Sequence, residues 1–271
     1  MRGASRSCCL PGAVGAVASA ASHELLGAEM DIGPGVAYVC QACAHGGTST
    51  RCILLAHDFP DFRTGRHRQL ADAFATQGWL AVLPDFSAAQ GPAESAGAEA
   101  WRAAVQAFAR DFLLPWLEAR GVVALQCVGF GVGAVTAALV ARSWTGVAQP
   151  KLLGTVLAQP TFGRPHVRSQ EELQQLLSAV EQPLLILPAS RGAVDLQAGG
   201  LVVEALHRAR GMSADVVEFA GSRPGFMIQG DITRQEVLEA LRWAAELSSE
   251  FLHRNFAAVD ATQLGEQGGG A

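Results

Sequence analysis

Charged residues are scarce in this chain. They make up 17% of its 271 residues, whereas an average soluble domain has about a quarter. Basic residues number 20 and acidic residues 25, so no positive excess favours nucleic acid or an anionic membrane surface as a partner. No apolar run is long enough to cross a bilayer. The 49% of hydrophobic residues suffices for one large buried core, which indicates a single α/β domain.

Cysteines are also few, with six in the whole chain. That density excludes a disulfide scaffold and suits a reducing compartment. Cys40 and Cys43 form one C-x-x-C pair near His45, but without a second pair the signal for metal or redox chemistry is weak. The pair falls in an apolar segment, 36–43, where cysteine commonly serves as a small buried side chain. We therefore expect no metal and no cofactor.

The first thirty residues can be interpreted in two ways. Arg2 and Arg6 are basic, serine and alanine are frequent, and no acidic residue precedes Glu24. This composition is typical of an organelle transit peptide, but it also fits a small-residue loop that leads into the first strand. The expected location is therefore cytoplasmic, or organellar if residues 1–30 are a targeting segment.

Short apolar segments alternate with segments of helical periodicity along the rest of the chain. Ser169 is a good N-cap for one of these helices, and Pro115 should break another near Leu114. Strands are expected at 36–43, 51–57, 79–83, 122–129, 152–157, 184–187 and 216–219. Helices are expected at 66–77, 96–120, 132–142, 170–180, 196–211 and 233–256.

This alternation predicts an α/β fold, with a mostly parallel, doubly wound sheet covered by helices on both faces. Residues 31–256 should form one domain, followed by a glycine-rich tail, 257–271, that we expect to be disordered. Ligands bind outside the carboxyl ends of the strands in such sheets. The chemistry should therefore lie just after the strands.

The apolar strand at 122–129 runs into a glycine-spaced turn, Gly-Phe-Gly-Val-Gly-Ala, at 129–134. A strand, a sharp turn and a helix make up a nucleophile elbow, whose central residue is normally serine or cysteine on a strained backbone. Here the central residue is Gly131, which carries no side chain. Glycine adopts positive φ without steric cost, so it would keep the turn while removing the nucleophile.

Three segments at strand ends resemble the dienelactone hydrolase family of the α/β-hydrolase fold. They are Leu-Leu-Ala-His-Asp-Phe at 54–59, the helix and strand from Leu70 to Phe86 that close in Pro-Asp, and Cys-Val-Gly-Phe-Gly-Val-Gly at 127–133. The opening Cys-Cys-Leu-Pro-Gly at 8–12 also resembles the start of many eukaryotic members, which favours a loop at the N-terminus. The resemblance spans about residues 30–255 in the order of elements.

The resemblance implies ester or lactone hydrolysis by a Cys-His-Asp triad. The matching positions hold Gly131 for the nucleophile, Arg191 for the acid and Pro224 for the histidine. Glycine cannot attack a carbonyl, proline cannot act as a base, and a guanidinium cannot orient an imidazole as a carboxylate does. We therefore expect a catalytically degenerate homologue with a small-molecule-binding or scaffolding role.

The alternative is an active carboxylic-ester hydrolase that uses displaced residues. Ser190 or Ser222 would then act with His57 or His166. Cys127 lies inside a strand and should be buried and inert, because reactive thiols need an exposed, electropositive site.

A pocket is expected around the strand ends. The residues that we expect to line it are His57, Asp58, Phe59, Val132, Ser190, Ser222, Arg223 and Phe226. Arg191 and Arg223, together with the Val132 N–H at a helix N-terminus, would favour a small anionic or ester-like ligand. The space above Gly131 should be either an open apolar pocket or filled by Phe130 or Phe226.

Overall fold

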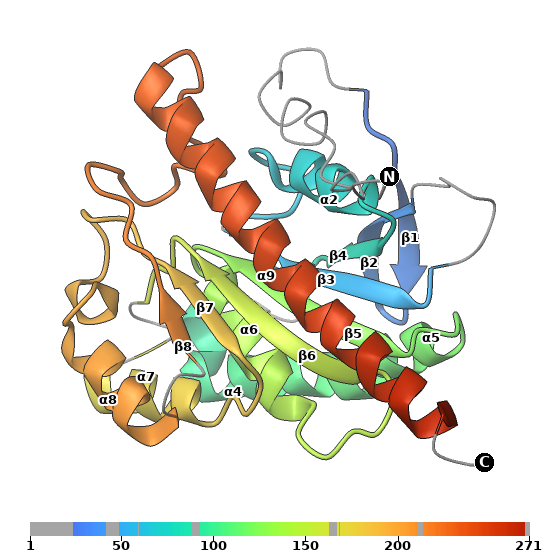
Figure 1. The fold of residues 1–271 in the computed structure, drawn as a ribbon. Helices are drawn as coiled ribbons and strands as arrows, with labels where there is room; N and C mark the ends of the chain where they lie inside the picture. Colours follow the sequence, from blue (N-terminus) through green and yellow to red (C-terminus); the bar gives the residue numbers. More distant parts are fainter. Residues whose placement is uncertain are drawn as a thin grey trace, which may run out of the picture.

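The computed structural model describes residues 24–41, 49–58, 60–87, 93–162, 167, 169–210 and 214–268. Eight strands within these residues form one sheet in the order β1-β2-β4-β3-β5-β6-β7-β8 (Figure 1). The strands are β1 Ala28–Ile32, β2 Gly35–Gln41, β3 Arg51–Ala56, β4 Leu80–Pro84, β5 Ala124–Phe130, β6 Lys151–Ala158, β7 Leu184–Leu187 and β8 Ala214–Val216. From β4 to β8 the neighbours are parallel, which confirms the mostly parallel sheet.

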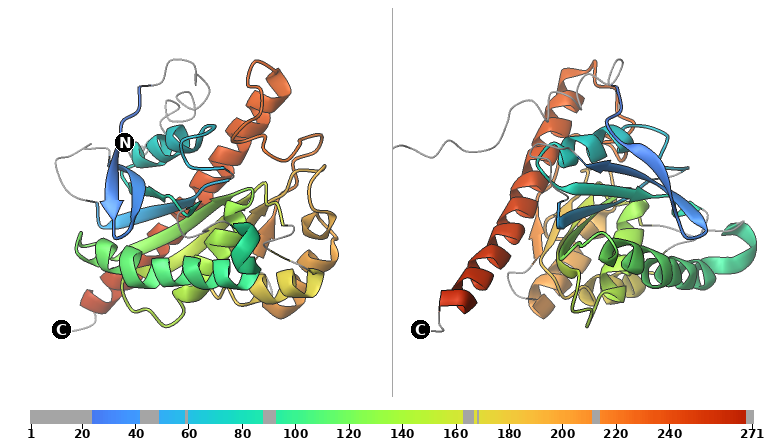
Figure 2. Two further views of the ribbon diagram at one scale, coloured as in Figure 1. Left: turned by 180° about the vertical axis from the view of Figure 1, so that it is seen from behind. Right: turned by 90° about the vertical axis from the view of Figure 1, so that its right-hand side faces the viewer.

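Helices cover both faces of this sheet (Figure 2). Buried residues of α2 and α9 belong to the hydrophobic core on one face, and those of α4, α6, α7 and α8 to the core on the other. The helices are α2 His67–Ala75, α4 Ala93–Phe108, α5 Leu114–Glu118, α6 Gly133–Ser143, α7 Gln170–Ser178, α8 Leu201–Arg210 and α9 Gln235–Gly268. The described helices contain no segment both long and apolar enough to cross a membrane.

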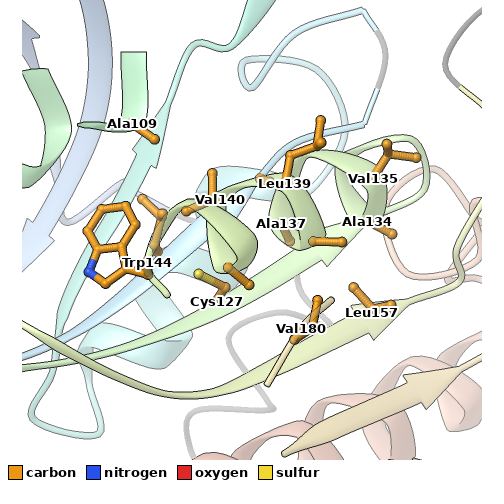
Figure 3. Packing of buried hydrophobic residues seen from close by; sticks show 14 of the residues in the cluster. Ala109, Cys127, Ala134, Val135, Ala137, Leu139, Val140, Trp144, Leu157 and Val180 are labelled. Atoms are coloured by element: carbon orange, nitrogen blue, oxygen red, sulfur yellow. The ribbon is translucent and has the colours of Figure 1, made fainter. Parts of the chain in front are cut away.

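Helix α6 packs directly on the strands that form the elbow (Figure 3). Its small residues Ala134 and Ala137 are buried, and Cys127 of β5 lies fully buried beneath the helix. Burial raises the pKa of the Cys127 thiol to about 12, so the thiolate is not formed at neutral pH. The expectation that Cys127 is buried is confirmed.

Several boundaries differ from the sequence prediction. The helix expected at 96–120 is divided by a π-helical turn, Ala109–Leu113, and α5 starts at Leu114, where Pro115 was expected to cause a break. Strand β1 was not predicted, because four of its five residues are exposed and no apolar run marks it. Helix α8 begins at Leu201, after a short 3₁₀ turn at Val194–Leu196.

The C-terminal end also differs from the prediction. Helix α9 continues past residue 256 to Gly268, so the disordered tail expected from residue 257 is wrong for most of its length. Residues 257–264 include alanine, glutamine and leucine, which favour helix, and the glycine run comes only at 268–270. Ser169 caps α7 as predicted, since its Oγ accepts a hydrogen bond from the Glu172 N–H at 3.2 Å.

Candidate functional site

The elbow has the expected backbone and close packing. Gly131 has φ +55°, the left-handed conformation that glycine adopts readily, between β5 and α6. A Cβ on Gly133 would lie 2.2 Å from the Ala56 carbonyl oxygen, and one on Gly129 would lie 2.4 Å from the Gly133 carbonyl oxygen. These glycines allow the start of α6 to press against β3 and β5, so the fold itself requires them.

The space above Gly131 is occupied by the carboxylate of Asp58. A Cβ built on Gly131 would lie 2.2 Å from Asp58 Oδ2 and 2.4 Å from Oδ1. Asp58 Oδ1 also accepts a hydrogen bond from the Val132 N–H at 3.1 Å. The side chain next to Gly131 is thus Asp58 rather than Phe130 or Phe226. It comes from the end of the neighbouring strand β3.

The Val132 N–H has a defined role in an active elbow. The N–H after the nucleophile and one from the loop between β3 and the following helix together form the oxyanion hole. In this chain Asp58 Oδ1 takes the first donor. The Asp58 N–H, which lies in the second region, donates to His67 Nε2 at 2.9 Å. Both of these donors are therefore engaged within the protein.

His67 is a site residue that the sequence did not reveal. Its side chain is fully buried, and its Nδ1 contacts the Thr64 carbonyl oxygen at 2.7 Å. Acceptance of the Asp58 N–H at Nε2 places the proton on Nδ1, so this imidazole is neutral. Burial lowers its pKa to about 4. The flanking Arg66 and Arg68 suggest a polar, exposed helix start, which is why the sequence gives no hint of a buried imidazole here.

His57 is also held by the backbone. Its Nδ1 lies 2.9 Å from the Asp58 carbonyl oxygen, and its Nε2 accepts a hydrogen bond from the Phe86 N–H at 3.1 Å. The side chain is only 5% exposed. Both ring nitrogens are therefore engaged, and neither is available as a base for a serine without rearrangement.

The loops that carry Arg191 and Pro224 lie side by side. The Arg191 N–H donates to the Ser222 carbonyl oxygen at 3.3 Å, and the Gly221 N–H donates to Ser190 Oγ at 2.8 Å. Arg191 and Pro224 are both exposed. The structure thus brings together the two loops that the family resemblance pairs, and the hydroxyl of Ser190 serves to join them.

The remaining sequence candidates among the described residues are exposed or have other partners. Arg223 is exposed, and Phe226 is buried against Phe219 with ring centroids 5.1 Å apart. Asp195, the nearest acid to the Arg191 position, accepts a hydrogen bond from Gln170 Nε2 at 3.0 Å. Further candidates lie outside the described residues: Cys8, Cys9, Cys43, His45, Phe59 and His166.

Two further residues missed by the sequence analysis anchor the loop after Pro224. The buried guanidinium of Arg66 donates to the carbonyl oxygens of Phe226 and Met227, both at 3.0 Å. Gln159 Oε1 accepts a hydrogen bond from the Met227 N–H at 2.8 Å. Gln159 directly follows β6 and has φ +46°, an uncommon conformation for a residue other than glycine. The loop is thus fixed next to the strand end that adjoins Gly131.

Metal ligands do not gather anywhere in the described part of the chain, where no group of three or more histidine, cysteine, aspartate or glutamate side chains could hold an ion. Cys40, from the C-x-x-C pair, is buried in β2. The prediction that no metal or cofactor is used stays a prediction.

Comparison with known proteins places this geometry within one fold. No family model and no curated relative matches the sequence. Among solved structures, the apo form of Thermogutta terrifontis esterase 2 is similar with a TM-score of 0.60 and 17% identity, covering 85% of this chain and 96% of that one. The dienelactone hydrolase from Anabaena variabilis has a TM-score of 0.57 and 15% identity, with 85% and 99% covered.

A dienelactone hydrolase-like promiscuous phosphotriesterase from metagenomic libraries is similar to the same extent, with a TM-score of 0.56 and 16% identity over 83% of this chain and 96% of that one. At identities this low, structural similarity shows a shared fold but does not show a shared activity. Together with the strand order and the elbow, they show that this chain has the α/β-hydrolase fold.

Proposed function

We propose that this protein is a non-catalytic homologue of the dienelactone hydrolases that acts by binding or scaffolding. The observation that carries the proposal is the Asp58 carboxylate above Gly131, hydrogen-bonded to the Val132 N–H. Gly131 offers no nucleophile. The positions expected to supply the acid and the base hold Arg191 and Pro224.

A carboxylate in this place also opposes the chemistry electrostatically. Acyl transfer needs hydrogen-bond donors aimed at the oxygen that becomes negative in the transition state. Here the Val132 N–H already donates to Asp58 Oδ1. The Asp58 carboxylate would repel the negative oxygen of a transition state placed beside it. Restoring a thiol at position 131 would therefore not be enough for activity, because Asp58 would still occupy the site.

Hydrolysis is the direct test of this proposal. We expect no turnover of p-nitrophenyl acetate or butyrate above the rate measured for Ser190→Ala and Ser222→Ala variants. The alternative, an active ester hydrolase with displaced residues, predicts turnover that one of these variants abolishes. Ester cleavage lost with Ser190 or Ser222 would overturn the proposal, and His57 and His166 would then be examined as bases.

The position of Asp58 also refines the expected ligand. The sequence suggested that an external anion would use the Val132 N–H, but Asp58 already holds that donor. Among the neighbours, one structure of Thermogutta terrifontis esterase 2 contains bound propionate, a small carboxylate. In this chain a carboxylate, that of Asp58, already lies next to Gly131 and accepts the Val132 N–H.

Replacement of Asp58 with alanine should therefore create an anion site. We expect propionate to raise the melting temperature of Asp58→Ala and to leave that of the natural chain unchanged, because a ligand that binds the folded state stabilises it by mass action. Asp61→Ala, a change in the same loop that leaves the Asp58 carboxylate in place, is the matched control. Equal stabilisation of all three proteins by propionate would show that Asp58 does not block the site.

A further inference from the structure

A groove of about 580 Å³ borders β8, the last strand of the sheet. Leu185, Val217, Leu247 and Phe251 form its apolar part, and charged residues of β8 and α9 lie among its lining. None of the lining residues belongs to β3, β5 or α6, so the groove is separate from the elbow. Its volume is within the range of sites that hold a small molecule or a short peptide segment.

Among the described residues no strand pairs with the outer edge of β8, which lines the groove. The N–H groups of Val217 and Phe219 donate to the Ile186 and Pro188 carbonyl oxygens of the inner neighbour, at 3.0 and 2.9 Å. Successive residues of a strand direct their backbone groups to opposite sides, so those of Val216 point toward the groove. Unpaired N–H and C=O groups at a sheet edge are a template for another strand.

The side chains at this edge are arranged for an extended segment. His207 Nε2 lies 3.1 Å from the Ala214 carbonyl oxygen, which marks one end of the open edge. Helix α9 supplies Leu247 and Phe251 on the side of the sheet where Asp215 lies, because Asp215 pairs with Arg254 of that helix at 3.1 Å. A strand added next to β8 would place alternate side chains against this helix.

The charges at the groove favour a positive partner. Arg254 is paired with Asp215, whereas Glu250 has no ion-pair partner among the residues whose side chains the structure describes. The lining thus carries one uncompensated negative charge when its histidine is neutral. A lysine or arginine placed near Glu250 would compensate it, and the exposed position of Glu250 means that the charge acts mainly on selectivity.

We propose that β8 binds an extended peptide as an additional strand. One apolar side chain of the peptide packs against Leu247 and Phe251, and a lysine or arginine two residues along lies beside Glu250. The backbone of Val216 provides the hydrogen bonds. A peptide fits better than a small molecule because the open backbone groups and the apolar surface lie along the same short strand.

The test uses a panel of eight-residue peptides that alternate valine with threonine and carry one lysine at a varied position. Binding to the full chain is measured by fluorescence polarisation. We expect saturable binding that depends on the position of the lysine, and about fivefold weaker binding to Glu250→Lys, because Glu250 is exposed. Glu246→Lys, an exposed charge reversal on the same helix outside the groove, should bind within about twofold of the natural chain.

A chemical change in the peptide separates strand addition from a nonspecific contact. N-methylation of the backbone amides that face β8 should abolish binding, while methylation of those that face away should be tolerated. No saturable binding by any peptide of the panel, or binding unaffected by Glu250→Lys and by N-methylation, would overturn the proposal. Self-association of the natural chain that Glu250→Lys removes would assign the groove to a second copy and would also overturn it.

Discussion

Replacement of Gly131 with alanine should lower the free energy of unfolding by about 3 kcal/mol. Gly131 has φ +55°, and an L-residue such as alanine in this left-handed conformation costs about 1–2 kcal/mol. The added Cβ would also displace the Asp58 carboxylate, because it would lie 2.2 Å from Oδ2. That displacement removes the hydrogen bond from the Val132 N–H, and hydrogen bonds to charged groups contribute about 1.5–3 kcal/mol. Urea denaturation measures the total.

Gly121→Ala is the matched control for this experiment. Gly121 has φ +70°, and a Cβ there would meet nothing within 4 Å, so the substitution should add backbone strain but no clash. A double-mutant cycle between Gly131→Ala and Asp58→Ala isolates the clash, which should make the double variant more stable than the sum of the single effects predicts. Additive effects, or the same loss of stability at Gly121 and Gly131, would show that Asp58 does not rest on Gly131.

Acidification should destabilise the protein between about pH 6.5 and pH 4 through His67. Burial lowers the pKa of this imidazole from 6.5 to about 4, so in this range the unfolded chain binds a proton that the folded chain does not. The free energy of unfolding therefore rises with pH across the window, and its full contribution is present above pH 6.5. A shift of this size corresponds to roughly 3 kcal/mol. Denaturation at a series of pH values measures it.

Two other groups must be separated from His67. The pKa of His253 is also lowered by burial, so His253→Gln is the control variant that should retain most of the pH dependence, whereas His67→Gln should lose it. The pKa of Asp85 is lowered to about 2 by His57 and by Ser87, and its contribution is lost only below about pH 4. Unchanged stability from pH 6.5 to pH 4 would contradict a neutral, buried His67.

The sequence predicted the parts of the fold that depend on local pattern. The apolar strands, the glycine-spaced elbow and the Ser169 cap each lie within a few consecutive residues, and all are present. Strand β1 was missed because it is exposed and pairs only with β2, so it has no apolar run of its own. The glycine run at the C-terminus predicts that α9 ends near residue 256, but the helix continues to Gly268.

The site was only half predictable for a different reason. That position 131 has no nucleophilic side chain follows directly from the sequence. Which side chain lies next to Gly131 depends instead on how the neighbouring strand end packs, and the sequence does not show this. Asp58 was expected as a pocket residue, at the acidic position that lies beside the nucleophile in the family that the sequence resembles. Its hydrogen bond joins it to Val132, which lies 74 residues away in the sequence. The Asp58 N–H donates to His67, and the charged residues on either side of His67 gave no indication that this imidazole is buried.

The contact between Gly131 and Asp58 also limits which side chains position 131 can hold. A cysteine introduced at position 131 would place its side chain in space that the Asp58 carboxylate holds. The acid would have to swing away in the same step, leaving its partner at Val132. A side chain at position 131 therefore requires a second, coordinated change at Asp58.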